Sequence, residues 1–574
     1  MVIKAGVGLF PQSFRNYLKK SPALTSFYSH SLQKSGLFYG FPSKKKRMAL
    51  YSQVVTRQEQ ICETVVGNNQ IKVDVLIWGD GNKIRESLNS LNNQTSFINS
   101  IYCISESVTG SIYKNTVNVR SIAEIPSSGL PVLMINAGDQ LHHKACANFS
   151  LYWETADIVY CDTDEIIKGV RQEPALLPDW NPDLQFSTAY ISTGVVIGSN
   201  LLDRLKRTAT GKFLRDIASI VAGVALFDHK VDVVHIPLSL CHAKTSKKRM
   251  SKCLENISSL LSTEDARVLR YPKQLVNCIQ WPLPQQPLIS LIIPTKNAKA
   301  LVKDCIESIL TKTTYNNYEI ILVDNNSDEQ ASLDYFDELS QHPKITLLKY
   351  PQPFNYSAIN NFAVKQCKGE VIGLVNNDIE VITPTWLDYM VGHVMREDIG
   401  CVGAKLLYSD GRVQHAGVVM GYGGGAGHAH KYFPRYHPGY LNRLIATNNF
   451  SAVTAACLLV KRTHYEAVNG LNEKDLTVAF NDVDFCLKVR ELGVRNLYCA
   501  EAELYHHESV SRGLDVSKEK MARFNRELAY LKEQWGHIIE HDPAYNPNLT
   551  LRHENFAIKD EKERREEARK SAKA

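Results

Sequence analysis

Three consecutive polar residues, Asn376, Asn377 and Asp378, end an apolar stretch that begins at Val371. Burying such a cluster without partners would cost free energy, because amide and carboxylate groups lose their hydrogen bonds to water. A hard divalent cation held together with a phosphate would satisfy these groups. The alternative is a turn at the end of a strand, in which Asn and Asp side chains cap the next segment. The cluster on its own favours the turn.

Other polar residues fall at the ends of neighbouring apolar stretches. Strands are predicted at Leu288–Thr295, Tyr318–Ser327, Ile345–Tyr350 and Glu370–Val381, and helical spacing lies between them at Ala300–Lys312 and Tyr356–Cys367. Alternating strands and helices form a parallel sheet, which binds ligands beyond the carboxyl ends of its strands. The residues expected to meet in that crevice are Thr295, Asn297, Asp324, Asn325 and the group 376–378.

Two further segments carry residue types suited to proton transfer or metal binding. Asp482 and Asp484 precede a predicted helix, where a carboxylate either caps the helix or serves as a general base. His506 and His507 follow a short strand, and imidazole is a common metal ligand, although paired histidines are more often structural or exposed. The Gly-rich run Gly421–His430 does not fit a Walker loop, and we interpret it as a mobile loop over the site.

The composition is that of an ordinary globular protein with more than one domain. The chain has 574 residues, 44% hydrophobic and 22% charged, and its net charge of +6 is too mild to indicate nucleic acid. Its 13 cysteines are scattered without a C-x-x-C pair, which argues against disulfides or structural zinc and indicates a reducing compartment. No signal peptide is recognised, and no apolar stretch approaches the roughly 20 residues of a membrane span. We therefore expect a cytoplasmic protein.

Five regions are expected along the chain. They are a basic, aromatic leader (1–70), an α/β domain (71–250), a Pro-rich linker (251–286), a second α/β domain (287–515) and a helical tail with a charged end (516–574). No Asp or Glu occurs in the leader before Gln58. Its basic and aromatic residues suit either peripheral contact with the cytoplasmic face of a membrane or a poorly ordered leader, with RNA binding a weaker third option.

The order of these segments is more specific than any one of them. From about Pro287 to Gly513 the chain resembles the family 2 glycosyltransferases of the GT-A fold, especially bacterial enzymes that build surface polysaccharides. The matching segments are Ser290–Asn297, Glu319–Glu329, Phe354–Val381, Gly400–Val419, Ser451–Arg462, Gly470–Gly493 and Tyr505–Gly513. The first α/β domain resembles a degenerate copy of that fold. The implied fold class is α/β, with two tandem GT-A-like (Rossmann-like) domains and mainly parallel sheets.

The resemblance implies a role for each matching position. The residues that would bind the nucleotide sugar are Pro294, Thr295, Asn297, Asp324, Asn325, Asn376 and Asn377. Asp378 stands in the DxD position and would hold Mg or Mn, with His506 or His507 completing the metal site. Asp482 would be the catalytic base, and Asp484 is the fallback. The chain departs from the family where the DxD motif reads Asn-Asn-Asp and where the usual Glu-Asp pair reads Asn481-Asp482.

The implied activity is metal-dependent, inverting transfer of a hexose or deoxyhexose from a nucleotide sugar to a growing, lipid-linked glycan such as O-antigen or capsule. The alternative is a weak or inactive pseudo-transferase that acts as a scaffold in a polysaccharide assembly complex, and the two motif departures support it. A nucleotidyltransferase ranks low, because no basic Gly-rich loop follows the first strand. In the first domain only Asp139 remains at the metal position, and no acidic pair precedes a helix, so we expect that domain to be non-catalytic. No nucleic-acid partner is expected.

Overall fold

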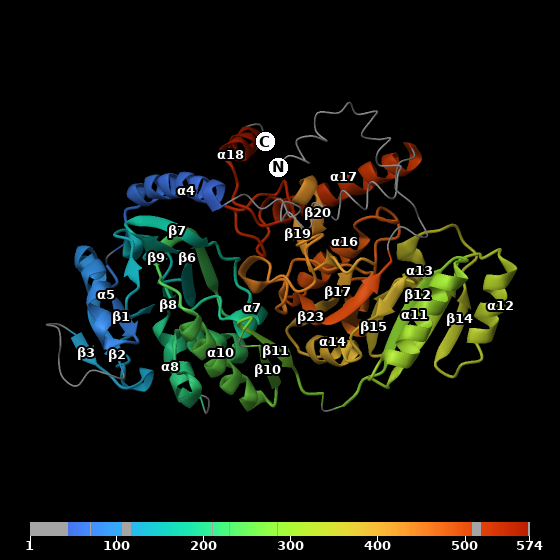
Figure 1. Cartoon of the computed structure of the whole chain (residues 1–574), viewed down its shortest axis with the longest axis horizontal. Coiled ribbons are helices and arrows are strands. Elements are labelled where there is room, and N and C mark those ends of the chain that lie inside the picture. The colour runs from blue at the N-terminus through green and yellow to red at the C-terminus, as the bar shows by residue number, and fades with distance from the viewer. Residues whose placement is uncertain are drawn as a thin grey trace.

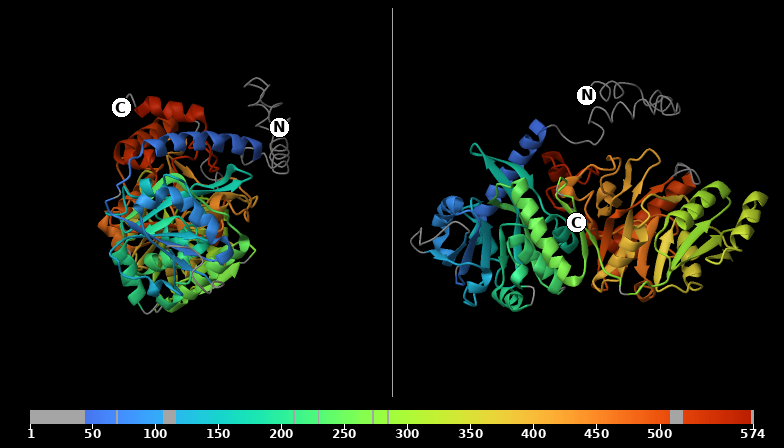
Figure 2. Two further views of the ribbon diagram at one scale, coloured as in Figure 1. Left: turned by 90° about the vertical axis from the view of Figure 1, so that its left-hand side faces the viewer. Right: turned by 60° about the horizontal axis from the view of Figure 1, so that its bottom comes forward.

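The computed structural model describes residues 44–68, 70–105, 116–208, 211–228, 230–271, 273–283, 285–507 and 518–571. Two α/β bodies lie side by side, a first body that ends near residue 283 and a second body that begins near residue 285 (Figure 1). Helix α4 (Lys44–Thr64) runs along the first body, and α17 (Lys518–Glu540) runs along the second (Figures 1 and 2). None of the helices described here is long and apolar enough to cross a membrane.

The first body is built on a sheet with the strand order β3-β2-β1-β4-β8-β6-β9-β5. Its strands are β1 (Val73–Trp78), β2 (Ile98–Ile104), β3 (Thr116–Asn118), β4 (Val132–Asn136), β5 (Gln140–Leu141), β6 (Ile158–Ile167), β7 (Val170–Ala175), β8 (Val195–Ile197) and β9 (Val233–His242). Its helices are α5 (Ile84–Leu91), α6 (Ala145–Phe149), α7 (Pro182–Thr188), α8 (Ser199–Arg207), α9 (Ile217–Phe227) and α10 (Lys247–Leu261). The hairpin of β10 (Arg267–Tyr271) and β11 (Val276–Gln280) follows.

The second body repeats this plan with the strand order β14-β13-β12-β15-β22-β17-β23-β16. Its strands are β12 (Ile289–Thr295), β13 (Tyr318–Asp324), β14 (Ile345–Lys349), β15 (Val371–Val375), β16 (Ile379–Val381), β17 (Ile399–Leu407), β18 (Val413–His415), β21 (Asn448–Asn449), β22 (Cys457–Lys461) and β23 (Arg495–His506). Its helices are α11 (Lys299–Lys312), α12 (Gln330–Leu339), α13 (Tyr356–Val364), α14 (Trp386–Val394), α15 (Arg462–Ala467) and α16 (Asn481–Arg490). The separate hairpin of β19 (Val418–Met420) and β20 (Ala426–His428) lies outside the main sheet.

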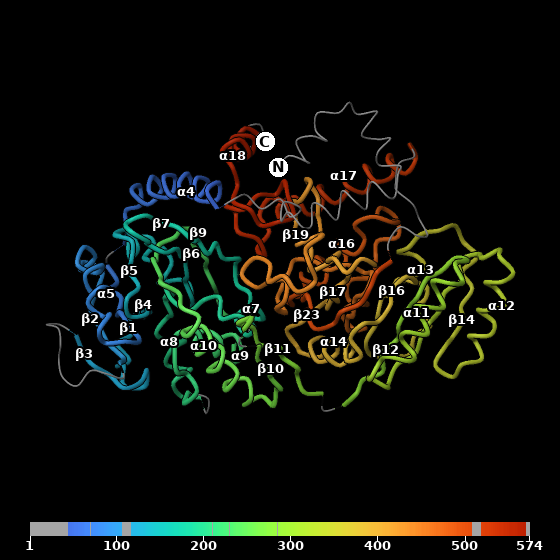
Figure 3. Tube along the Cα trace, viewed as in Figure 1, coloured from blue at the N-terminus to red at the C-terminus, as the bar shows by residue number. Residues whose placement is uncertain are grey.

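The eight-strand paths of the two sheets correspond in order, and the Cα trace shows where their strands lie in each body (Figure 3). In each, one strand runs antiparallel to both of its neighbours: β8 in the first body and β22 in the second. The other central pairs are parallel, because helical crossovers connect their strands. The tandem GT-A-like fold predicted from the sequence is therefore confirmed.

Apolar side chains cover both faces of the second sheet. Along β12, Leu291 and Ile293 pack into one core cluster, whereas Ile292 packs into the cluster on the opposite face. All three side chains are fully buried. A strand buried on both faces reads as a continuous apolar run, which is why β12 was visible in the sequence.

The stretch 251–286 is folded instead of forming the expected linker. Most of α10 and the whole β10–β11 hairpin lie within it, and Leu254, Ile257 and Ile279 are buried in the core of the first body. The apolar residues of α10 recur at helical spacing on one face only, and β10 alternates exposed and half-buried residues. Because polar residues occupy the solvent-facing side of both elements, the sequence pattern did not predict them.

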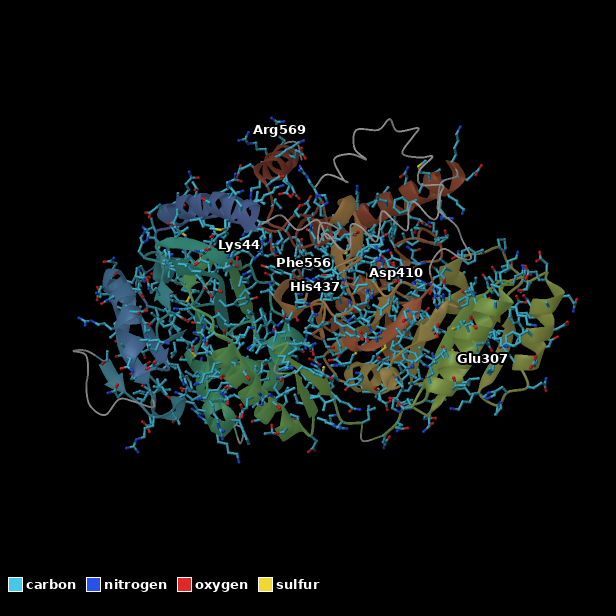
Figure 4. The ribbon with its side chains drawn as sticks, viewed as in Figure 1. Lys44, Glu307, Asp410, His437, Phe556 and Arg569 are labelled. Atoms are coloured by element: carbon cyan, nitrogen blue, oxygen red, sulfur yellow. The ribbon has the colours of Figure 1, made fainter. Side chains whose placement is uncertain are left out.

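The two ends of the chain also pack more closely than expected. The final part of the leader forms α4, whose Tyr51 and Val54 are buried; the leader expected at residues 1–43 lies outside the described residues. Between α17 and α18 (Glu561–Ser571), the chain returns to the junction of the two bodies, where Phe556 is buried (Figure 4). There, Asn546 Nδ2 donates to Asp162 Oδ1 of the first body at 3.1 Å. The tail therefore joins the two bodies.

Candidate active site

The ends of β12, β13 and β15 bring the predicted polar residues together. Thr295 and Asp324 are neighbours in the parallel register of β12 and β13. The backbone N–H of Asn325 donates to Thr295 O at 2.8 Å. From the end of β15, Asn377 Nδ2 donates to Thr295 Oγ1 at 2.9 Å. The predicted residues therefore meet at the edge of the sheet where the crevice was expected, and Pro294 lies beside them, opposite Val323.

Asn297 and Asn325 use their side chains to shape the loops of this crevice. Asn297 has a left-handed backbone (φ 53°), and its Oδ1 accepts from the backbone N–H of Asp328 at 2.9 Å. Asn325 Nδ2 donates to Tyr350 O at 3.0 Å. Asp324 Oδ1 accepts from the backbone N–H of Ser327 at 3.0 Å and is almost fully buried. These bonds fix the conformation of the loops that follow β12 and β13.

The antiparallel pairing of β16 with β23 sets the metal edge of the site. Ile379 pairs with His506, which brings the imidazole Nε2 to 3.2 Å from Asp378 Oδ1. His506 Nδ1 lies 2.6 Å from Gln414 Oε1, which can accept a proton held on Nδ1. Nε2 faces Asp378 and the Nδ2 of Asn376, 3.3 Å away. A histidine that binds a metal through Nε2 would carry its proton on Nδ1.

The adjacent His507 lies in different surroundings. Its Nε2 is 3.2 Å from Glu380 Oε2, and its Nδ1 is 2.7 Å from Ser409 Oγ. Of the two imidazole rings, only that of His506 lies against the Asp378 carboxylate, whereas His507 reaches Asp378 through its backbone N–H, which donates to Asp378 O at 2.9 Å. Within the described ranges, no group of three or more His, Cys, Asp or Glu residues could hold a metal ion. Asp378 and His506 fit a cation that takes its other ligands from diphosphate oxygens and water, as Mg and Mn do in nucleotide sites.

Asp482 faces a pocket of about 570 Å³ beside this edge. The residues that line it are Tyr356, Asn376, Gln414, His428, Thr454, Ala455, Ala456, Val478, Asn481, Asp482 and His506. Asp482 Oδ2 accepts from the backbone N–H of Ala455 at 3.1 Å, and its Oδ1 accepts from that of Val483 at 2.9 Å. Burial raises the pKa of the Asp482 carboxyl, and these two hydrogen bonds offset only part of that increase.

Asp484 points away from this pocket. It is almost fully buried, its Oδ1 accepts from Trp535 Nε1 of α17 at 3.0 Å, and its Oδ2 lies 3.4 Å from Lys488 Nζ. Successive helical residues face different directions, and two positions along α16 turn the side chain from the pocket to the core. The geometry therefore separates the two candidate carboxylates.

The Gly-rich segment 421–430 is a packed hairpin instead of the mobile loop that we expected. Met420 is buried, and its backbone N–H donates to Asp542 Oδ2 at 2.7 Å. A Cβ on Gly425 would lie 2.7 Å from Leu528 of α17, so the absence of side chains permits this close packing. The sequence reasoning missed His428 and Gln414 of the pocket. Gln414 lies within a segment that carried the family resemblance, which was the one available signal.

The first body has the same positions but different partners. Because β5 pairs with β9 as β16 pairs with β23, Asp139 and His242 correspond to Asp378 and His506. Asp139 Oδ1 lies 3.3 Å from Arg249 Nη1, and His242 Nδ1 lies 2.5 Å from Asp164 Oδ1. Helix α9, the counterpart of α16, carries alanine as its second residue, where α16 carries Asp482. The carboxylate at the position of Asp378 thus has an arginine partner in the first body, whereas Asp378 itself faces a histidine.

Residues 290–467 match the family described as glycosyl transferase family 2. The chain is 41% identical over 420 residues to "Uncharacterized protein y4gI" of Sinorhizobium fredii, covering 70% of this chain and 46% of that protein. It is 32% identical over 443 residues to the O-antigen biosynthesis protein RfbC of Myxococcus xanthus, covering 73% of this chain and 33% of that protein. The chain thus spans about a third to a half of the length of these relatives. A solved mannosyltransferase from Pyrobaculum calidifontis, in complex with GDP-Man and Mn2+, aligns with a TM-score of 0.34 at 16% identity, over 46% of this chain and 70% of that one.

Proposed function

We propose that this chain, which belongs to the family 2 glycosyltransferases, moves a sugar from a nucleotide sugar to a hydroxyl of a growing surface glycan, with inversion of the anomeric carbon. The observation that carries the proposal is one pocket lined by both Asp482 and His506, whose imidazole lies 3.2 Å from Asp378. Thr295 and Asp324, the proposed nucleotide-binding residues, lie side by side at the ends of β12 and β13. This arrangement suits a single displacement, in which base, acceptor hydroxyl, anomeric carbon and leaving group fall in line.

Asp482 would accept the proton of the attacking hydroxyl. Its raised pKa suits this role, because a more basic carboxylate removes a proton more readily. The two backbone N–H donors hold the carboxylate in place and leave lone pairs for the acceptor. Since the proton transfer and the attack occur on the face opposite the leaving nucleotide, one step inverts the sugar.

Asp378 and His506 would hold the divalent cation, Mn or Mg, which stabilises the negative charge of the leaving diphosphate. Gln414 Oε1 would hold the proton of His506 on Nδ1, and the cation would replace the contact between Asn376 Nδ2 and His506 Nε2. Thr295 and Asp324 would bind the nucleoside. One carboxylate in place of the two in a DxD motif predicts weaker metal binding, with more of the coordination supplied by the donor itself.

The acceptor would be a lipid-linked glycan of the O-antigen or capsule type at the cytoplasmic face of a membrane. RfbC, which is named for O-antigen biosynthesis, supports this part of the proposal. We further propose that the first body is non-catalytic, because Arg249 already pairs with Asp139 and no carboxylate stands at the position of Asp482.

The test is nucleotide release from a panel of UDP-, dTDP- and GDP-sugars by the 574-residue chain, in the presence of Mn and again with EDTA. We expect release from one donor class, and its loss with EDTA. Release that EDTA leaves unchanged would exclude the metal role of Asp378 and His506. Binding of these nucleotides without turnover on any glycan acceptor would favour the scaffold alternative.

A further inference from the structure

The pocket beside Asp482 contains an imidazole that the mechanism above does not use. His428 ends β20 and lines the same pocket as Asp482. Its Nδ1 is buried and has no hydrogen-bond partner among the residues that the structure describes. Buried polar atoms are nearly always hydrogen-bonded in folded proteins, so a pocket-lining exception points to a partner that arrives with the substrate.

The contacts of His428 place it on the side of the base. Its ring packs edge-on against His415 with centroids 5.2 Å apart, and His415 Nε2 accepts from the backbone N–H of Thr454 at 3.2 Å. The next residue, Ala455, donates its N–H to Asp482. One short chain of contacts therefore links the imidazole to the residues that hold the base.

The hairpin that carries His428 touches the start of α16 as well. A Cβ on Gly425 would lie 3.7 Å from Phe480, the residue before Asn481 and Asp482. Neither Thr295 nor Asp324, which mark the nucleotide crevice, is among the residues that line this pocket. We therefore assign the pocket to the transferred sugar and the acceptor, the groups that lie beyond the nucleotide. His428 lies on the side of this pocket that carries Asp482.

We propose that His428 is an acceptor-binding residue, whose imidazole holds one hydroxyl of the acceptor sugar while Asp482 deprotonates the neighbouring hydroxyl. This inference rests on the proposed function. Burial lowers the pKa of His428 well below its usual range, and the nearby His415 and Lys431 add to the effect, so the ring is neutral at pH 7. A neutral imidazole offers one donor and one acceptor, which matches the two capacities of a sugar hydroxyl.

The experiment compares His428→Leu and His428→Gln with the wild-type enzyme. The acceptor probe is the methyl glycoside that the wild type glycosylates fastest, chosen from hexoses, 6-deoxyhexoses and N-acetylhexosamines. We expect His428→Leu to raise the acceptor KM about five- to tenfold, the effect of one lost hydrogen bond. The donor KM and the slow, acceptor-independent hydrolysis of the donor should stay within about twofold of wild type, because water needs no acceptor site. His428→Gln should restore most of the acceptor affinity, since its amide keeps a donor and an acceptor.

His464→Leu is the matched control, because His464 is half-buried on α15 and does not line the pocket. A raised donor KM or reduced hydrolysis in His428→Leu would overturn the proposal by placing His428 on the donor sugar. An unchanged acceptor KM in a folded His428→Leu enzyme would also overturn it. A wild-type enzyme that turns over no donor would instead refute the proposed function itself.

Discussion

Replacing Asp482 with asparagine tests the central assignment of the mechanism, since the change removes the basic oxygen and keeps the shape of the side chain. Both carboxylate oxygens accept from backbone N–H groups in the folded protein, from Ala455 and Val483. The side-chain oxygen of an asparagine can accept from one of these two N–H groups. Its NH2 group then faces the other N–H group, which loses its acceptor. The expected structural cost is about 1–2 kcal/mol, the penalty of one unmatched donor.

The catalytic cost is expected to be larger. A positioned general base contributes about 10²–10⁴ in rate. At about 1.4 kcal/mol for each factor of ten, this corresponds to roughly 3–5.5 kcal/mol of transition-state stabilisation. The loss should appear in kcat, because the base acts during the displacement and the donor is bound at other residues.

Asp484→Asn is the matched control for Asp482→Asn. Its Oδ1 could still accept from Trp535 Nε1, and it would lose only the contact with Lys488. The assay is donor turnover with acceptor, together with thermal unfolding of both variants. An Asp482→Asn enzyme that retains wild-type kcat would refute the role of Asp482 as the base. An Asp484→Asn enzyme that loses activity to the same degree, without a change in unfolding temperature, would favour Asp484 as the catalytic base.

Three further predictions concern the metal edge, the first body and the junction. Alanine at Asp378 or His506 should raise the Mn concentration needed for half-maximal turnover at least tenfold. Alanine at His507 should change that concentration less than threefold. Equal effects of the two histidine substitutions in a metal titration would contradict the geometry. Asp139→Asn should leave the Mn dependence of a folded enzyme unchanged, and a shift in the same titration would show that the first body binds metal. Burial alone would lower the pKa of His235, but bonds to Asp162 and Asp179 outweigh it and raise the pKa to about 9. The resulting stabilisation is complete below about pH 6.5 and is lost as pH rises through about 9, so thermal unfolding of His235→Gln should flatten that pH dependence.

The parts of the fold that were predictable from sequence are those where burial is uniform. Strands such as β12 and β15 are apolar along their whole length, and the polar residues that follow them could be assigned to one sheet edge. The helix α10 and the hairpin β10–β11 were missed, because half of their residues face solvent and a nearby Pro-rich tract suggested a linker. Their core contacts come from residues distant in sequence, which a local pattern does not reveal.

The same distinction applies to the residues of the candidate site. Thr295 and Asp324 end their strands and Asn376 follows its strand directly, so strand order alone predicted that these residues meet. His428 reaches the pocket from a separate hairpin whose glycines indicated only conformational freedom. The choice between two adjacent histidines, or between two carboxylates two positions apart, depends on which face each side chain takes, and this requires coordinates.

The contacts at the junction of the two bodies give a physical reason why the chain would keep a first body that we propose to be non-catalytic. Asn449 of β21 donates from its backbone to Asn181 Oδ1 at 3.0 Å and from its Nδ2 to Asp183 Oδ2 at 2.9 Å, both in the first body. The chain runs on from Asn449 to Ala455, whose N–H holds Asp482. A catalytic carboxylate must be held to within about half an ångström to keep its rate advantage. The first body would thereby support the segment that positions the proposed base, and this role would require its fold but neither a metal site nor a base of its own.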